Sequence, residues 1–447
     1  MVMSAMRGDP DAGQYGLSLL RDTGLTSGTL YPTLIRLQRA GFIDPRWEEN
    51  GRRCYLLTPA GITAFAASTE GTVRTASRSG AWWLPAAAIA AIESYMALFR
   101  PAGVRLSDLA VYMGAVNGLR DGASLYAFMS ADQAPFTYPP FAGLILLPLT
   151  YAATFPLQLA WTLVTVATIV GLSGLLARTA TTAPHPLLAP AVAAALFLSA
   201  PVSSDLKFGQ VSIGLAALVV VDVVALRNSR FHGVLVGLAA AVKLTPLIFI
   251  PMLWLARRRK AALAAASTFV ACGAVSWAAL PADSWLFWGT HMWHASRLGQ
   301  ITSVGNQSFN GALMRLGITD PARSLTVLVV AGVVAAVALR RAGHLGRNGD
   351  WLSATVVAGA ASIVVSPVSW THHQVWLVMA ALLPVRGSAW VQRAWSAAVL
   401  AVMCLPVTAL GPPVWSNARM LTAIGVACLL PIQSRPVAHS NYPIHRS

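Results

Sequence analysis

The sequence predicts a polytopic all-α membrane protein that carries a small α+β domain at its N-terminus. Of its 447 residues, 56% are hydrophobic and only 11% are charged, a balance typical of integral membrane proteins. Apolar runs follow one another from Gly80 onward, whereas residues 1–70 have mixed charge and the apolar periodicity of a soluble domain. We expect the apolar runs to form helices. The bilayer core contains no water to hydrogen-bond the backbone, and a helix pairs the N–H and C=O groups within one segment.

Two short helices and a hairpin account for residues 1–70. The stretch YGLSLLRDTG predicts a helix that ends at Gly24, and a second helix is expected from Ser27, its N-terminal cap, to a stop at Gly41. The following FIDPRWEENGRRCYLLTPAG predicts a hairpin with Asn50-Gly51 as its turn. One face of the second helix carries Leu30, Leu34 and Leu37. Two helices followed by a two-stranded wing make a winged helix, which we expect a linker at 71–80 to join to the rest.

Twelve apolar runs then predict about 10–12 transmembrane or re-entrant helices over 81–432. Several runs are shorter than the roughly 20 residues that a simple span needs, so some helices should be broken. The runs are 81–99, 139–155, 157–177, 187–203, 211–226, 233–256, 261–280, 325–339, 352–365, 374–385, 394–410 and 420–432.

Positive charge suggests which loops face the cytoplasm. The net charge is +16, and such an excess concentrates in cytoplasmic loops. On this basis the N-terminal domain and a tail at 433–447 are cytoplasmic, and the loops 100–138, 281–324 and 366–373 face outward. The basic residues used for this assignment are Arg74, Arg78, Arg257, Arg258, Arg259, Lys260, Arg340, Arg341, Arg347, Arg386 and Arg393.

The run 233–256 has two readings, since it contains Lys243 and Pro246 in its middle. It is either one span or a hairpin broken at Lys243-Leu244-Thr245-Pro246. The hairpin is favoured, because a lysine and a proline at membrane depth are costly in an unbroken span.

Few carboxylates follow residue 80, and Asp108 stands out because it comes just beyond the first run, on the expected outer side. Asp205 and Asp283 are second choices for a reactive carboxylate, Asp132 is expected to be solvated, and Asp222 to be buried or interfacial. The four cysteines have no metal-binding spacing, and adjacent histidines make a poor chelate. We therefore expect no metal and no cofactor.

The N-terminal segments TSGTLYPTLIRLQRAGFI and GRRCYLLTPAG resemble the PadR-like transcriptional regulators. There is no full first helix before Tyr15 and no long dimerisation helix after Gly61, which departs from that family. The resemblance makes DNA a possible partner, with Arg52 and Arg53 of the wing near its phosphates. A solvated hairpin tip is the alternative reading of these two arginines.

Seven segments on the expected outer side, in order, resemble glycosyltransferase family 87, the polyprenol-phosphate-mannose-dependent mannosyltransferases of the GT-C type. The resemblance covers about 81–432 and includes SPVSWTHHQVWLV, in which Pro, Trp and two histidines would be costly unless they line a polar cavity. The other segments are DLAVY, LRDGASLYAF, FTYPPFAGLILLPL, FGQVSIGL, GVLVGLAAAVKLTPLIF and NQSFNGALMR.

The resemblance implies an enzyme that moves a hexose, expected to be mannose, from a polyprenyl-phosphate donor to a glycolipid or glycan acceptor at the outer face of the cytoplasmic membrane. Asp108 would be the general base of an inverting reaction; its alternative role is to cap a helix. The donor phosphate would lie at Lys243, His372 and His373, with Lys207 and Arg315 as weaker choices. Lys243 could instead extend from a cytoplasmic hairpin toward water. Substrate contacts are expected from Tyr138, Gln210, Asn306, Gln307 and Trp370.

Two other classes of protein compete with the enzyme. A membrane-tethered transcriptional regulator would use the winged helix as output and the spans as a sensor, but it would not need these outer polar segments in this order. A transporter or flippase of lipid-linked sugar is expected to have internal repeats of hydropathy, and we find none in the sequence.

Overall fold

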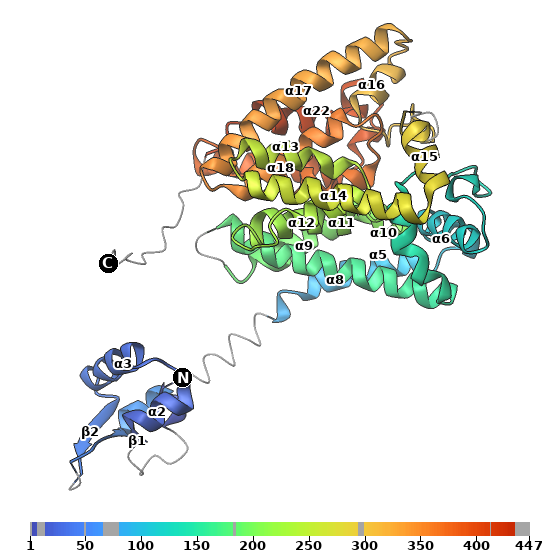
Figure 1. Ribbon diagram of the computed structural model, residues 1–447. Coiled ribbons are helices and arrows are strands. Elements are labelled where there is room, and N and C mark those ends of the chain that lie inside the picture. Colours follow the sequence, from blue (N-terminus) through green and yellow to red (C-terminus); the bar gives the residue numbers. More distant parts are fainter. Residues whose placement is uncertain are drawn as a thin grey trace. The chain divides into compact units, whose positions relative to one another are not determined.

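The computed structural model describes residues 2–6, 14–48, 51–65, 80–181, 185–293, 299–411 and 413–433 (Figure 1). The chain divides into two compact units, Met1–Leu84 and Pro85–Ser447. The turn residue Asn50, most of the expected linker and the tail beyond Gln433 lie outside the described residues.

The first unit is the predicted winged helix. Its helices are α1 (Val2–Ala5), α2 (Gly16–Thr23) and α3 (Ser27–Arg39), and residues 59–65 are also helical. The sheet has the order β1-β3-β2, with β1 (Gln14–Tyr15), β2 (Ile43–Trp47) and β3 (Arg53–Leu57) all antiparallel. Gly24 ends α2 with a φ of +65°, as predicted, but Thr26 rather than Ser27 takes the N-cap position of α3. The two-residue β1 was not predicted, because it is too short to have a periodicity.

The described part of the second unit consists of helices and the loops between them, with α6 (Ser107–Arg120) and α15 (Pro281–Gly289) together at one end (Figure 1). Among the described residues, three helices are long and apolar enough to cross a membrane, namely α8 (Thr154–Ala180), α14 (Arg259–Ala279) and α17 (Ala322–Arg347). A fourth candidate is the pair α9 (Leu188–Leu198) and α10 (Ala200–Phe208), which is bent by 63°. The predicted mixture of full and broken apolar helices is thus confirmed. The α-helices are α5 (Leu84–Leu98), α6 (Ser107–Arg120), α7 (Pro140–Leu146), α8 (Thr154–Ala180), α9 (Leu188–Leu198), α10 (Ala200–Phe208), α11 (Ser212–Val220), α12 (Val234–Val242), α13 (Phe249–Leu255), α14 (Arg259–Ala279), α15 (Pro281–Gly289), α16 (Phe309–Arg315), α17 (Ala322–Arg347), α18 (Trp351–Val365), α19 (Val375–Ala380), α20 (Ala389–Cys404), α21 (Pro413–Ser416) and α22 (Ala418–Ile424).

The run 233–256 is a hairpin with Lys243 at its tip. The backbone turns extended at Lys243 and continues through a short 3₁₀ helix, η5 (Thr245–Ile248), into α13. Gly233, which precedes α12, packs against Ala261 in the first turn of α14. The other end of the run, at Ala256, directly precedes the start of α14. Both ends of the run therefore lie at the same end of α14, which is the broken hairpin favoured by the sequence and not a single span.

Replacing Gly233 by Ala should loosen this hairpin. Gly233 has a φ of +101°, and an added Cβ would lie 2.0 Å from the carbonyl oxygen of Ala261, so strain and a backbone clash combine. We expect a loss of about 1–3 kcal/mol in the free energy of unfolding, seen as a lower melting temperature of the detergent-solubilised protein. Gly171→Ala is the matched control, because nothing lies within 4 Å of the corresponding position in α8. Equal melting temperatures for the two variants would contradict the packing.

Candidate active site

A cavity of about 610 Å³ in the second unit brings together seven of the residues that the sequence predicted for the site. They come from the first turn of α6, the loop before α7, the α10–α11 loop, the tip of the 233–256 hairpin and the loop between α18 and α19. These segments are far apart in the chain, so the fold assembles the site. The seven residues are Asp108, Tyr138, Gln210, Lys243, Trp370, His372 and His373.

Asp108 lies at one side of the cavity and is held by Gln210. The amide nitrogen Nε2 of Gln210 donates a hydrogen bond to Oδ2 of Asp108. The amide oxygen Oε1 accepts from the hydroxyls of Tyr112 at 2.8 Å and Tyr138 at 3.0 Å. Burial raises the pKa of Asp108, while the Gln210 hydrogen bond, the charge of Lys243 and a hydrogen bond with the Ser107 side chain act in the opposite direction.

The alternative role of Asp108, as a helix cap, does not hold. The residue before α6 is Leu106, and α6 has no side-chain capping hydrogen bond. The Asp108 carboxylate lines the cavity instead. Tyr112 was missed by the sequence analysis, although it follows Asp108 by one helical turn and therefore shares its face of α6.

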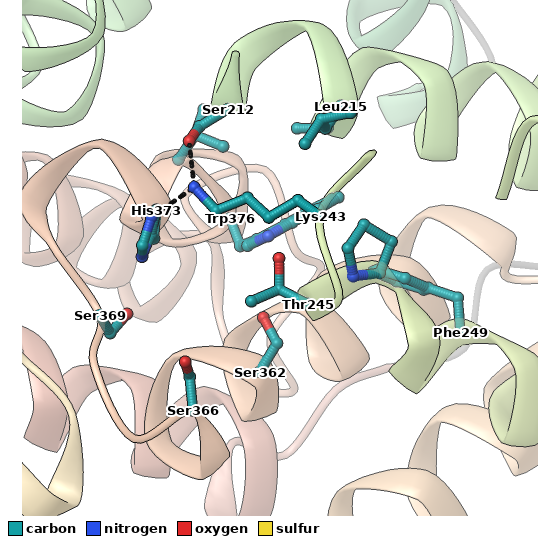
Figure 2. A pocket seen from close by; sticks show the side chains of 13 residues that line it. Ser212, Leu215, Lys243, Thr245, Phe249, Ser362, Ser366, Ser369, His373 and Trp376 are labelled. Atoms are coloured by element: carbon teal, nitrogen blue, oxygen red, sulfur yellow. Dashed lines mark hydrogen bonds between the residues drawn. The ribbon is translucent and has the colours of Figure 1, made fainter. Parts of the chain in front are cut away.

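Lys243 lies in the wall between the large cavity and a narrow one of about 30 Å³. Its ammonium group is 2.7 Å from Nε2 of His373, 3.3 Å from the hydroxyl of Tyr138 and 3.5 Å from that of Ser212. Figure 2 shows the lysine side chain extended between Ser212 and His373, with hydroxyl groups around the narrow cavity. The charged group thus points into the site and does not extend toward the basic end of the hairpin. The hydroxyl-bearing residues of the narrow cavity are Ser212, Thr245, Ser362, Ser366 and Ser369.

His373 has its proton fixed on the nitrogen that faces Lys243. The backbone N–H of Trp370 donates to Nδ1 at 3.1 Å, so the neutral ring carries its proton on Nε2. Burial lowers the pKa of His373 well below its usual range, and the charge of Lys243 lowers it further. Two hydrogen-bond donors, the Nε2–H of His373 and the ammonium of Lys243, therefore face each other without an acceptor between them. An anionic oxygen beside this pair of donors would accept from both.

His372 adds another buried nitrogen to the same wall. Its ring stands nearly perpendicular to that of His373, with 4.5 Å between the ring centroids. Within the part of the chain that the structure describes, Nε2 of His372 is buried and has no hydrogen-bond partner. Burial lowers its pKa as well, which keeps the ring neutral near pH 7.

Asn306 and Gln307 do not reach the cavity, which corrects their predicted role in substrate recognition. Both are fully buried. Oδ1 of Asn306 accepts from the backbone of Ser308 and Ser369, while Gln307 donates to the carbonyl of Ser416 and accepts from the N–H of Met420. With their amides used in this way, the two residues fasten the loop before α16 to the segment that carries the histidines.

The weaker choices also lie elsewhere. Lys207 is exposed and stacks on Phe208, and Arg315 is bonded to loop carbonyls and to Asn417. Asp283 accepts from Ser124, and Asp205, only 1% exposed, accepts from the N–H of Ile213 at the start of α11. Asp132, which was expected to be a solvated loop residue, is exposed but lines the cavity.

The wing arginines of the first unit have local contacts. Arg53 donates to Gln38 at 3.3 Å, and its guanidinium lies over the rings of Trp47 and Tyr55. Arg52 precedes β3 and likewise has a contact within the chain. Nothing in these contacts favours DNA as a partner.

The described residues contain no group of three or more His, Cys, Asp or Glu side chains that could hold a metal ion. The groups that line the cavity are instead the half-buried carboxylate of Asp108, the exposed carboxylate of Asp132, one ammonium, three imidazoles and several hydroxyls and amides. Such a set can accept a proton at one side and bind an anion at the other.

Comparison with known proteins gives two family matches. The family model of glycosyltransferase family 87 matches residues 136–367, and that of the transcriptional regulator PadR-like family matches residues 15–67. Asp108, His372 and His373 lie outside the first of these ranges. No solved structure matches the chain at a significant level.

Curated relatives are mycobacterial. A polyprenol-phosphate-mannose-dependent alpha-(1-2)-phosphatidylinositol pentamannoside mannosyltransferase of Mycolicibacterium smegmatis is 33% identical over 284 residues, which is 62% of this chain and 69% of the relative. A polyprenol-phosphate-mannose-dependent alpha-(1-2)-phosphatidylinositol mannoside mannosyltransferase of Mycobacterium tuberculosis is 30% identical, over 62% of this chain and 69% of that protein. A protein of the same description from M. smegmatis is 30% identical over 68% of this chain and 76% of the relative.

Proposed function

Because the chain belongs to glycosyltransferase family 87, we propose that its cavity transfers mannose from a polyprenyl-phosphate donor to a glycolipid of the phosphatidylinositol mannoside class. The protein is a membrane-bound mannosyltransferase, and the relatives' names supply the donor and acceptor classes. The observation that carries the proposal is the division of the cavity into a carboxylate side at Asp108 and an anion-binding side at Lys243 and His373.

The carboxylate side suits the acceptor. In the proposed step, Asp108 takes the proton of an acceptor hydroxyl while the oxygen of that hydroxyl bonds to the anomeric carbon of mannose. The bond between the anomeric carbon and the phosphate oxygen breaks, and its electron pair leaves with the polyprenyl phosphate. Attack opposite to the leaving group inverts the anomeric centre, so a β-linked donor gives an α product. The raised pKa of Asp108 favours this role, because a more basic carboxylate is a better proton acceptor.

The anion-binding side suits the leaving phosphate. The ammonium of Lys243 has only the long contacts to the hydroxyls of Tyr138 and Ser212, and it faces the Nε2–H of His373, so a phosphate oxygen could accept from both groups. The negative charge on the bridging oxygen grows as the bond to mannose breaks, and donors fixed in a site of low water content stabilise such charge strongly. Because the leaving group is stabilised by these donors, it needs no proton.

We further propose that the cavity faces the outside of the cytoplasmic membrane. Lys243 is at the tip of the 233–256 hairpin, whereas the four basic residues 257–260 are at its other end, between α13 and α14. Arg347 also lies there, since it donates to the carbonyl of Leu255 at 2.6 Å. Positive charge marks the cytoplasmic end of a membrane bundle, so the tip and the cavity belong to the opposite side.

The test of this function is transfer of label from radiolabelled polyprenyl-phosphate mannose in membranes that contain the protein. We expect a mannosylated phosphatidylinositol mannoside as the product, with a new α linkage that an α-mannosidase removes. Membranes from a host that does not contain the protein and does not catalyse this transfer are the control. No transfer by a protein that is present and inserted would contradict the donor assignment, and a β-linked product would contradict inversion.

A further inference from the structure

We propose that Gln210 is a positioning residue for the general base: its amide holds Oδ2 of the Asp108 carboxylate and so fixes the orientation of that carboxylate toward the acceptor. This inference rests on the proposed function, in which Asp108 is the base. It replaces the sequence-based interpretation of Gln210 as a residue that binds a sugar hydroxyl. The hydrogen bond from Nε2 of Gln210 to Oδ2 of Asp108 is the contact on which it depends.

The orientation of the Gln210 amide is fixed by its other contacts. Oε1 accepts from Tyr112 and Tyr138, two hydroxyls that themselves lie 2.8 Å apart. A carboxylate accepts hydrogen bonds and cannot donate them, so the amide must present its NH₂ group to Asp108. With Oε1 occupied by two tyrosines, the amide oxygen has no lone pair left for a sugar hydroxyl. The amide oxygen and one N–H of Gln210 are thus engaged by the protein.

The backbone at Gln210 is held as firmly as its side chain. Its N–H donates to the carbonyl of Asp205 at 3.0 Å, and the carboxylate of Asp205 accepts from the N–H of Ile213 at 3.1 Å. Gly209, with a φ of +68°, lets the loop lie directly on α6, where an added Cβ would come within 2.8 Å of Leu109. The loop that carries Gln210 therefore packs on the turn that carries Asp108.

One further contact connects the base to the donor side. Tyr138, which donates to Gln210, also accepts from Lys243 at 3.3 Å. A continuous set of hydrogen bonds thus runs from Asp108 through Gln210 and Tyr138 to Lys243. These hydrogen bonds fix the position of the carboxylate relative to the proposed site of the donor phosphate, and in-line attack requires such a fixed geometry.

Gln210→Leu is the test, with kcat, KM and the pH dependence of kcat as readouts. Wild-type transfer should fall as the pH drops through the pKa of Asp108, because the base is then protonated. The Gln210 hydrogen bond favours the charged carboxylate, so its loss should raise the pKa of Asp108. The fall in kcat on the acid side of the pH profile, here called the acid limb, should then move to higher pH. We expect kcat to fall by about 10- to 100-fold at neutral pH with little change in KM for the donor, as when a partner that orients a reactive group is removed. The titratable groups that face Asp108 are Lys243, Asp205, Tyr112 and Tyr138.

Matched variants make the test decisive. Gln158, in α8, does not line the cavity, and among the described residues its side chain is hydrogen-bonded to Arg105 alone. The pH profile of Gln158→Leu should therefore be that of the wild type. Tyr112→Phe removes one of the two hydroxyls at Oε1 while keeping the ring, and should shift the acid limb in the same direction by a smaller amount.

Three results are distinguishable. A higher KM for donor or acceptor with an unmoved acid limb in Gln210→Leu would overturn the proposal and restore the role in sugar binding. If Gln210→Leu does not fold, Tyr112→Phe becomes the deciding variant. A wild-type pH profile of kcat for Tyr112→Phe would also overturn the proposal. Retained transfer by Asp108→Asn would instead reject the base itself, which is a failure of the proposed function.

Discussion

Replacing Asp108 by Asn should abolish measurable mannosyl transfer while leaving the protein folded and inserted. An amide cannot take the acceptor's proton, and loss of a general base costs about 10²- to 10⁴-fold in rate. Asn has the size of Asp, and its oxygen can still accept the hydrogen bond that Gln210 donates to this position. The loss should therefore appear in kcat, with binding of the donor retained.

The comparison is with Asp121→Asn, the same chemical change at the other end of α6. Asp121 is exposed, pairs with Arg120 at 3.7 Å and does not line the cavity. Both variants should have wild-type melting temperatures in detergent, and only Asp108→Asn should lose transfer. If Asp108→Asn transfers mannose at the wild-type rate, the base must be sought at Asp132, the other carboxylate among the described lining residues of the cavity. Asp205 and Asp283 are less suitable, because both are buried outside the cavity.

Local signals in the sequence predicted the elements of the fold well. Gly24 and Gly41 end their helix or turn with positive φ, where glycine has no steric cost. The lysine and proline within 233–256 predicted a break, and the chain does turn there. These features depend on residues close to one another in the chain, which is why one sequence suffices to predict them. The two-residue β1 depends on pairing with β3 and left no such signal.

Partners within the site could not be predicted in the same way. The side chains of Gln210 and Tyr112 bond across 98 positions of sequence, and Gln210 and Asp108 across 102. The sequence indicated that Gln210 is polar in an apolar context, which is equally compatible with binding a sugar and with holding another side chain. Only the fold shows that its amide is taken up by Asp108 and two tyrosines.

Asn306 and Gln307 show the opposite error. Their amides suit sugar hydroxyls in type and lie in a loop expected to face outward, so a role in recognition followed from the sequence. The structure buries them with backbone partners, because the loop needs internal acceptors and donors to pack against the segment 366–373. Residue type alone cannot separate a binding amide from one that holds a loop, since the difference lies in burial.

Replacing Lys243 by Met should have the second largest effect, and it should separate activity from stability. Lys243 provides the charge on the proposed phosphate side, and the loss of a fixed group that stabilises developing negative charge costs about 10²- to 10³-fold in kcat. Methionine fills a similar volume and removes the ammonium that now faces the Nε2–H of His373 at 2.7 Å. In the absence of the lipid-linked sugar, the melting temperature of the variant should therefore be no lower than that of the wild type, because a buried charge that faces a second hydrogen-bond donor has been removed.

The matched control is Lys207→Met, in which an exposed lysine that stacks on Phe208 is lost outside the cavity. Transfer rate, inhibition by added polyprenyl phosphate and melting temperature would be measured for the three proteins. The phosphate role requires that Lys243→Met lose both transfer and inhibition by polyprenyl phosphate, while Lys207→Met keeps both. A Lys243→Met protein that still binds polyprenyl phosphate as the wild type does, but melts earlier, would make the lysine a structural contact of Tyr138 and Ser212. The donor phosphate would then have to be sought at the buried nitrogen of His372, which also lines the cavity and has no partner within the described residues.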